Sequence, residues 1–172
     1  MKIKFKSLLV LPAFIAAYLL DSGAHAMGPL FRHIDFIMIA SVYALLRGRE
    51  ADAFIFGCSA YILRELSVMP MPGLTSFPAA AALFCAVLMS GSLYKGNFIT
   101  KVFILTSACL VKAVVYTAAV WLYYWKGNFY FFTLMPLAGV ISTAAAGALV
   151  YKIADFNYRG SFRWFKMKSA AK

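Results

Sequence analysis

Six long apolar runs, separated by short junctions rich in glycine, proline and lysine, constrain the fold of this 172-residue chain more than any other feature. The runs cover residues 7–20, 34–46, 51–69, 77–93, 99–125 and 129–153. A helix needs roughly 20 apolar residues to cross the hydrocarbon core of a bilayer, and only the first two runs are clearly shorter. Hydrophobic side chains make up 63% of the chain and charged ones 13%, against roughly 45–50% and 25% in soluble domains. We therefore expect an all-α polytopic membrane protein with six transmembrane helices in one domain, residues 1–155, and five helices as the alternative.

The basic residues indicate how these helices would be oriented. With the N-terminus in the cytoplasm, Arg32 and Lys126 fall on the outer side, and Arg64 and Lys112 lie within predicted spans. The other 13 of the 17 lysines and arginines then fall on the cytoplasmic side, as the positive-inside rule requires. Both termini are therefore expected to be cytoplasmic. We interpret the net charge of +11 as an orientation signal, because the basic residues do not form the single stripe typical of nucleic-acid binding.

The N-terminal segment leaves one alternative open. Three lysines precede an apolar stretch and then Ala24-His25-Ala26, a pattern similar to a signal-peptide cleavage site. Cleavage there would leave five spans and an N-terminus outside the cytoplasm. Because the apolar stretch is long for a signal and Pro12 interrupts it, we expect an uncleaved first helix.

Residues 156–172 form a tail in which basic and aromatic residues alternate. Such a mixture can bind RNA by stacking, but directly after a cytoplasmic helix end it fits anionic lipid headgroups better, at roughly 1 kcal/mol per basic residue. A protein partner is the remaining alternative. We therefore expect the tail to bind the anionic leaflet and expect no nucleic-acid partner. The residues assigned to this lipid-surface role are Arg159, Arg163, Trp164, Lys166 and Lys168.

Three ionisable residues lie inside predicted spans, where a charge is unfavourable and is therefore a candidate for function. Glu65 lies about 21 Å along the third predicted helix and Lys112 about 20 Å along the fifth, which runs in the same direction. Equal depth predicts an ion pair between them, while Arg64 is expected to extend to the outer surface. We favour a pair that fixes helix register over a substrate or proton site.

The sequence contains no set of residues that matches a catalytic motif. Two histidines, His25 and His33, lie close to Asp21 and Asp35 on the predicted outer side, but their spacing matches no metal-ligand pattern. The three cysteines, at positions 58, 85 and 109, are far apart inside apolar runs and are interpreted as small buried hydrophobes. A nucleophile elbow, a zinc-protease helix and a phosphate loop are all missing. We therefore expect a protein that is not an enzyme and has no metal or cofactor.

Small residues spaced four apart allow helix backbones to approach each other closely in a membrane. They recur on the first and the sixth predicted helices, and on the fourth at Ala86 and Ser90. We expect one such face to pack inside the protein and regard another as a candidate for docking a partner. The candidate packing or partner residues are Ala13, Ala17, Gly57, Gly139, Thr143 and Gly147.

Several short motifs occur in a recognisable order between Pro29 and Asp155, about three-quarters of the chain. They are Leu46-Arg47-Gly48-Arg49, Phe54-Ile55-Phe56-Gly57, Arg64-Glu65-Leu66, Pro72-Gly73-Leu74 and Tyr94-Lys95-Gly96-Asn97-Phe98. With the final small-residue helix and basic tail, this order resembles the rod shape-determining protein MreD family. Glu65 stands where that family usually has aspartate, a departure that keeps the charge.

The resemblance implies a non-enzymatic inner-membrane subunit of the bacterial cell-elongation complex. Such proteins associate with the coiled-coil partner MreC. Through MreC they connect to the actin-like MreB filament, to the peptidoglycan polymerase RodA and to a penicillin-binding transpeptidase. The implied role is to help organise peptidoglycan synthesis by helix-to-helix docking.

Substrate-binding subunits of energy-coupling-factor vitamin transporters provide the alternative. They have a similar size, six helices and cytoplasmic termini, and they resemble the MreD family in fold. They also dock the coupling subunit through an Ala-x-x-x-Ala face on the first helix, which Ala13-Phe14-Ile15-Ala16-Ala17 would supply here. A tightly retained vitamin would favour this alternative.

Overall fold

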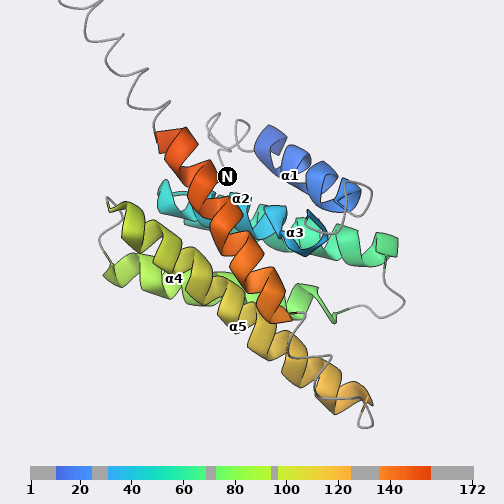
Figure 1. Ribbon diagram of the computed structural model, residues 1–172. Helices are drawn as coiled ribbons and strands as arrows, with labels where there is room; N and C mark the ends of the chain where they lie inside the picture. The colour runs from blue at the N-terminus through green and yellow to red at the C-terminus, as the bar shows by residue number, and fades with distance from the viewer. Residues whose placement is uncertain (1–10, 25–30, 69–72, 94–96, 125–135, 156–172) are drawn as a thin grey trace, which may run out of the picture.

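The computed structural model describes residues 11–24, 31–68, 73–93, 97–124 and 136–155. In these ranges the regular structure is entirely helical, as expected (Figure 1). The last helix, Pro136–Asp155, is called the C-terminal helix below. The other elements are α1 (Leu11–Gly23), the 3-10 turn η1 (Phe31–His33), α2 (Phe36–Leu46), α3 (Glu50–Val68), α4 (Ser76–Ser92) and α5 (Phe98–Tyr124).

The helices follow the predicted apolar runs closely where the two can be compared. The second to fifth runs begin and end within two residues of α2, α3, α4 and α5. The first run is displaced by a few residues, and the sixth begins in residues outside the described ranges. Two glycines in the described turns, Gly48 and Gly73, have φ angles of 76° and 97°. Only glycine adopts this region without strain. Gly48 lies in the turn after α2 and Gly73 in the turn before α4, where the sequence predicts breaks.

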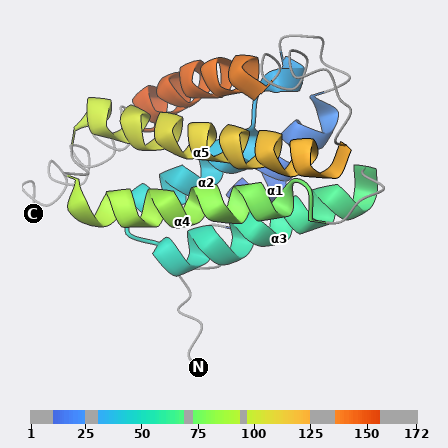
Figure 2. The ribbon, with the colours of Figure 1, turned by 90° about the horizontal axis from the view of Figure 1, so that it is seen from below.

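The short helix α2 lies at the centre of the bundle. Seven of its residues are buried, and it contacts α1, α3, α4 and α5. Helices α4 and α5 run side by side along one flank (Figure 2), while the C-terminal helix crosses over α2 and α5 (Figure 1). The core is therefore built around α2, which is 11 residues long and rises only about 16 Å.

Glycines allow the helices of the bundle to pack closely against one another. A Cβ atom on Gly57 of α3 would lie 2.6 Å from Ser41 Oγ of α2 and 2.9 Å from Leu83 Cδ1 of α4. On the C-terminal helix, a Cβ on Gly147 would clash with Leu105 of α5. Gly139 is less tightly packed, because its Cβ would lie 3.5 Å from the nearest atom.

The small-residue ridge of the C-terminal helix, Gly139, Thr143 and Gly147, therefore packs inside the protein. Thr143 is 1% exposed, and its side chain forms part of the polar contacts described below. On α1, Ala17 is buried whereas Ala13 is exposed. The two alanines thus do not form one outward-facing pair.

Large apolar side chains cover the outside of the bundle. Those more than half exposed include Leu19, Ile55, Leu66, Phe77, Phe84, Leu88, Ile99, Val114, Leu122, Ile141 and Ile153. Apolar exposure on this scale is unusual for a soluble monomer. Two helices in the described ranges, Phe98–Leu122 and Pro136–Asp155, are long and apolar enough to cross a membrane, and α1, α2 and α4 are apolar but shorter.

Candidate functional site

Two non-helical residues separate the turn η1 from α2. Side chains of the C-terminal helix form hydrogen bonds with the backbone at this point. Asp35 is the N-cap of α2, and its carboxylate accepts a hydrogen bond of 2.9 Å from the Met38 N–H. The Asp35 N–H donates to Thr143 Oγ1 at 2.9 Å, and Ser142 Oγ donates to the His33 carbonyl at 3.1 Å. Because buried backbone groups need partners, these hydroxyls permit α2 to begin inside the bundle.

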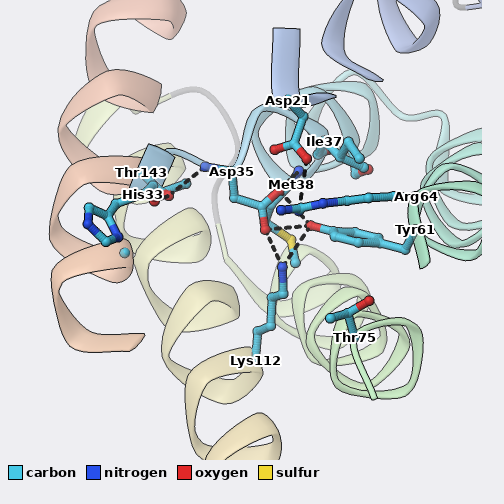
Figure 3. Close-up of polar contacts among 12 residues, drawn as sticks. Asp21, His33, Asp35, Ile37, Met38, Tyr61, Arg64, Thr75, Lys112 and Thr143 are labelled. Carbon is cyan, nitrogen blue, oxygen red and sulfur yellow. Dashed lines mark hydrogen bonds and ion pairs between the residues drawn. The ribbon is translucent and has the colours of Figure 1, made fainter. Parts of the chain in front are cut away.

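Asp35 is also the centre of an ionic contact that is largely but not fully buried, since the Asp35 and Lys112 side chains are 14% and 19% exposed (Figure 3). Its carboxylate pairs with the Lys112 ammonium group of α5. The Tyr61 hydroxyl of α3 donates to the same carboxylate and lies 2.7 Å and 2.6 Å from its two oxygens. The ammonium nitrogen is 4.3 Å from the centre of the Tyr61 ring, within cation–π range. Tyr61 is fully buried, so one residue each from α3 and α5 fixes the start of α2.

A second ion pair lies beside the first. Arg64 Nη1 of α3 is 2.8 Å from Asp21 Oδ2 of α1, although this contact lacks hydrogen-bond geometry. Asp21 is 3% exposed, whereas the Arg64 side chain is 26% exposed. Figure 3 shows the Arg64 guanidinium group next to Asp35 and Tyr61. We call Asp21, Asp35, Tyr61, Arg64 and Lys112 the polar cluster; its two carboxylates balance its two cations.

The predicted Glu65–Lys112 ion pair is wrong. The Glu65 carboxylate instead accepts hydrogen bonds of 2.6 Å from the Thr75 N–H and 2.6 Å from Ser76 Oγ. It therefore joins the end of α3 to the start of α4. The dipole of α4 also stabilises a negative charge at this end of the helix. Lys112 lies near the middle of α5, as predicted, but the anion at that level is Asp35, because α2 begins inside the bundle.

Replacement of Glu65 with glutamine tests its role as a cap of α4. We expect the free energy of unfolding to fall by about 1 kcal/mol, because the hydrogen bonds to Thr75 and Ser76 lose their charge-assisted character. Unfolding in mixed detergent micelles measures this change. Ser76→Ala in a double-mutant cycle with Glu65→Gln is the control, and strictly additive losses would contradict a direct bond.

The remaining predicted positions give no further cluster. The tail residues Arg159, Arg163, Trp164, Lys166 and Lys168 and the histidine at position 25 lie outside the described residues. In the described ranges, no group of three or more His, Cys, Asp or Glu side chains could hold a metal ion. The cysteines at positions 58, 85 and 109 are free thiols.

The polar cluster has the chemistry of a network that joins helices. It connects α1, α3 and α5 to the start of α2, and Thr143 adds the C-terminal helix. In a low-dielectric interior the loss of one member leaves its partner charge uncompensated, which is strongly destabilising. The arrangement therefore makes the relative positions of five helices interdependent.

Sequence reasoning missed three members of the cluster: Asp21, Asp35 and Tyr61. The orientation predicted from the basic residues puts both aspartates on the outer side, away from the charges within the spans. The signal that could have found Asp35 is the shortness of the second apolar run, residues 34–46. A run of that length covers only about 20 Å, so its first residues begin within the bundle. Tyr61 has no comparable signal, because aromatic residues occur throughout the chain.

Comparisons of the chain with models of protein families, with curated proteins and with solved structures find no match.

Proposed function

We propose that this chain is an integral protein of the bacterial inner membrane that crosses the membrane six times, with both termini in the cytoplasm. The exposed apolar side chains on α1, α3, α4, α5 and the C-terminal helix support this proposal, because lipid would cover them. The ionic groups near the middle of α5 are paired inside the bundle, as charged groups at membrane depth require.

Within that membrane we propose a non-enzymatic role in the cell-elongation complex, like that of the MreD family. The observation that carries the proposal is that the residues of the motifs behind the resemblance have structural roles that other residue types would not fill. Gly48 and Gly73 have positive φ angles, Gly57 lies against α2 and α4, and Glu65 caps α4. A family that shares these motifs would need the same residues for the same turns and close helix contacts, which supports the resemblance.

The proposed mechanism is docking between helices rather than chemistry. The partner would be an MreC-like coiled-coil protein with a membrane anchor, which in turn connects to MreB, RodA and a penicillin-binding transpeptidase. A bundle whose helices are tied together by the polar cluster would present its apolar faces to such an anchor as one rigid surface. Helix packing of this kind needs no ligand or cofactor.

Purification of the tagged full-length protein from its own cells tests this role. We expect a coiled-coil membrane protein to co-purify in stoichiometric amount, and we expect cells depleted of the chain to change from rods to spheres. As a control, depleted cells are given a Gly91→Ala variant, which is altered at an exposed position with open space around it. This variant should restore their rod shape. Depleted cells that stay rod-shaped would contradict the proposal.

The substrate-binding subunit of a vitamin transporter remains the second candidate. It is favoured by the polar cluster at the N-terminus of α2, because helix N-termini inside transporters point toward bound substrate groups. The alanine face argues against it, since Ala17 is buried against the bundle while Ala13 is exposed. A vitamin retained in equimolar amount by the purified protein would support this candidate over the first.

A further inference from the structure

The outward face of α3 carries a polar residue in the middle of an apolar surface. Helix α3 lies at the edge of the bundle (Figure 2), and Ser59, halfway along it, is exposed. The charged residues further along the helix turn away from this face, because Arg64 pairs with Asp21 and Glu65 caps α4. Among the described helices, Ser59 is the only exposed polar residue that lies more than two turns from both ends of its helix. Its hydroxyl would therefore face the hydrocarbon region of the bilayer, where a polar group without a partner is unfavourable.

The Ser59 hydroxyl is available for a hydrogen bond to another molecule. Serines in helices commonly donate to a carbonyl of the preceding turn, and Ser67 of the same helix donates to the Leu63 carbonyl at 2.8 Å. Ser59 forms no hydrogen bond through its side chain with the residues that the structure describes. Both its donor and its acceptor are therefore open on the outward face of α3.

Three large apolar residues share this stripe of α3 with the serine. Ile55, Ile62 and Leu66 are 59%, 49% and 72% exposed. Together with Ser59 they follow one another at intervals of four, three and four residues, which is the spacing of the seam between two helices that wind around each other. A single polar residue in such a seam fixes the register of the two helices. We call Ile55, Ser59, Ile62 and Leu66 the α3 seam.

We propose that two copies of this chain pair through the α3 seam, around a two-fold axis perpendicular to the membrane. Two copies inserted with the same orientation place their α3 helices parallel and at the same depth, so Ser59 of one copy meets Ser59 of the other. A hydroxyl both donates and accepts, so this residue can bond to its own copy, whereas two like charges would repel each other. The small side chain also lets the two backbones approach closely.

A second copy fits this face better than the other possible occupants. Lipid tails would leave the hydroxyl without a partner, and the helix of another protein would need a polar residue at the same depth. A second copy meets that requirement by symmetry alone. The proposal rests on the proposed membrane location, with α3 as one of the spans, and not on a role in cell elongation.

Cross-linking of the full-length protein in lipid vesicles tests the contact. The partly exposed cysteines at positions 58 and 85 are replaced with alanine, while Cys109, which is 5% exposed, stays in place. In this background Ser59→Cys should convert the monomer to a disulfide-linked dimer under mild oxidation, because the two thiols face each other across the axis. Ile141→Cys on the C-terminal helix is the control, since that position is 71% exposed but lies away from the seam. Equal linking at both positions would reflect random collision and would overturn the proposal.

Energy transfer between copies that carry two different fluorophores measures the affinity of the dimer in the same vesicles. Ser59→Ala should weaken the dimer about threefold to tenfold, the effect of losing a hydrogen bond between helices in a membrane. Because Ser59 is exposed, this substitution should not lower the free energy of unfolding of the dispersed monomer in detergent. Ser67→Ala is the matched control on the same helix and should leave the affinity unchanged, since the Ser67 hydroxyl is bonded to its own helix. An affinity that Ser59→Ala leaves unchanged would overturn the pairing of the two hydroxyls.

The anchor helix of another protein is the competing occupant of this face. In that case the purified chain would stay monomeric in vesicles, and Ser59→Cys would cross-link to the other protein in native membranes alone. That result would overturn pairing between copies of this chain. None of these outcomes depends on whether cells lacking the chain lose their rod shape, so the role in cell elongation is decided by its own test.

Discussion

Replacement of Lys112 with methionine is expected to lower the free energy of unfolding by about 3–5 kcal/mol, the largest effect of a single substitution predicted for this protein. The methionine fills a similar volume, so the loss reflects charge rather than packing. The Asp35 carboxylate, whose side chain is 14% exposed, would lose its direct ion-pair partner while it still caps α2 and accepts from Tyr61. The neighbouring Arg64 guanidinium group is already paired with Asp21. Breaking a buried pair from one side has a penalty of this size.

Asp35→Asn in the same background should restore part of that stability. With both charges removed, no unpaired ion remains in the interior, and the two losses should fall short of additivity by at least about 2 kcal/mol. Unfolding in mixed detergent micelles measures all three variants. Additive losses would show that Lys112 and Asp35 do not interact in the folded protein.

Lys101→Met provides the matched control on the same helix. Lys101 is as little exposed as Lys112, at 13% against 19%, but its partner Asp155 is 27% exposed and retains Arg47 as a second cation. Partly exposed ion pairs contribute about 0–1 kcal/mol. A loss for Lys101→Met as large as that for Lys112→Met would contradict the assignment of the large effect to the unpaired carboxylate of Asp35.

The helices of this protein could be predicted because they coincide with apolar runs, and residues typical of turns mark the ends of those runs. Prolines at 70 and 72 with Gly73, and the lysine–glycine pairs at 95–96 and 126–127, interrupt runs that are otherwise continuously apolar. The bounds of α3, α4 and α5 follow from these breaks to within a residue. Local signals of this kind need no knowledge of how the helices pack.

The polar cluster could not be predicted in the same way, because it depends on rotation and on depth. Glu65 and Lys112 lie at the same predicted height, yet Glu65 points toward the start of α4. The anion that pairs with Lys112 is 77 residues away in sequence, at the interrupted start of α2. The sequence gives the position of a residue along its helix. Contacts between helices, such as the hydrogen bond from the Asp35 N–H to Thr143, determine which face of one helix packs against which face of another.

Gly57 illustrates the same dependence on packing and carries the second large prediction. The apolar sequence around it permits any small residue, but the space between α3, α2 and α4 does not. A Cβ at this position would lie 2.6 Å from Ser41 Oγ, 3.3 Å from Ser41 Cβ and 2.9 Å from Leu83 Cδ1. Ser41 and Leu83 are fully buried, and the Ser41 hydroxyl is bonded to the Ile37 carbonyl at 2.7 Å. Neither side chain therefore has free space into which to move.

Gly57→Val is accordingly expected to destabilise the protein by about 3 kcal/mol, the upper end of the usual effect of overpacking, and Gly57→Ala by about 1–2 kcal/mol. Gly91→Val on α4 is the matched control, because a Cβ there meets nothing within 4 Å. It should be neutral or slightly stabilising, since valine is a better helix former than glycine. Unfolding in the same detergent system measures both series. Losses at Gly57 no larger than those at Gly91 would show that α3 does not lie as close to α2 and α4 as this packing requires.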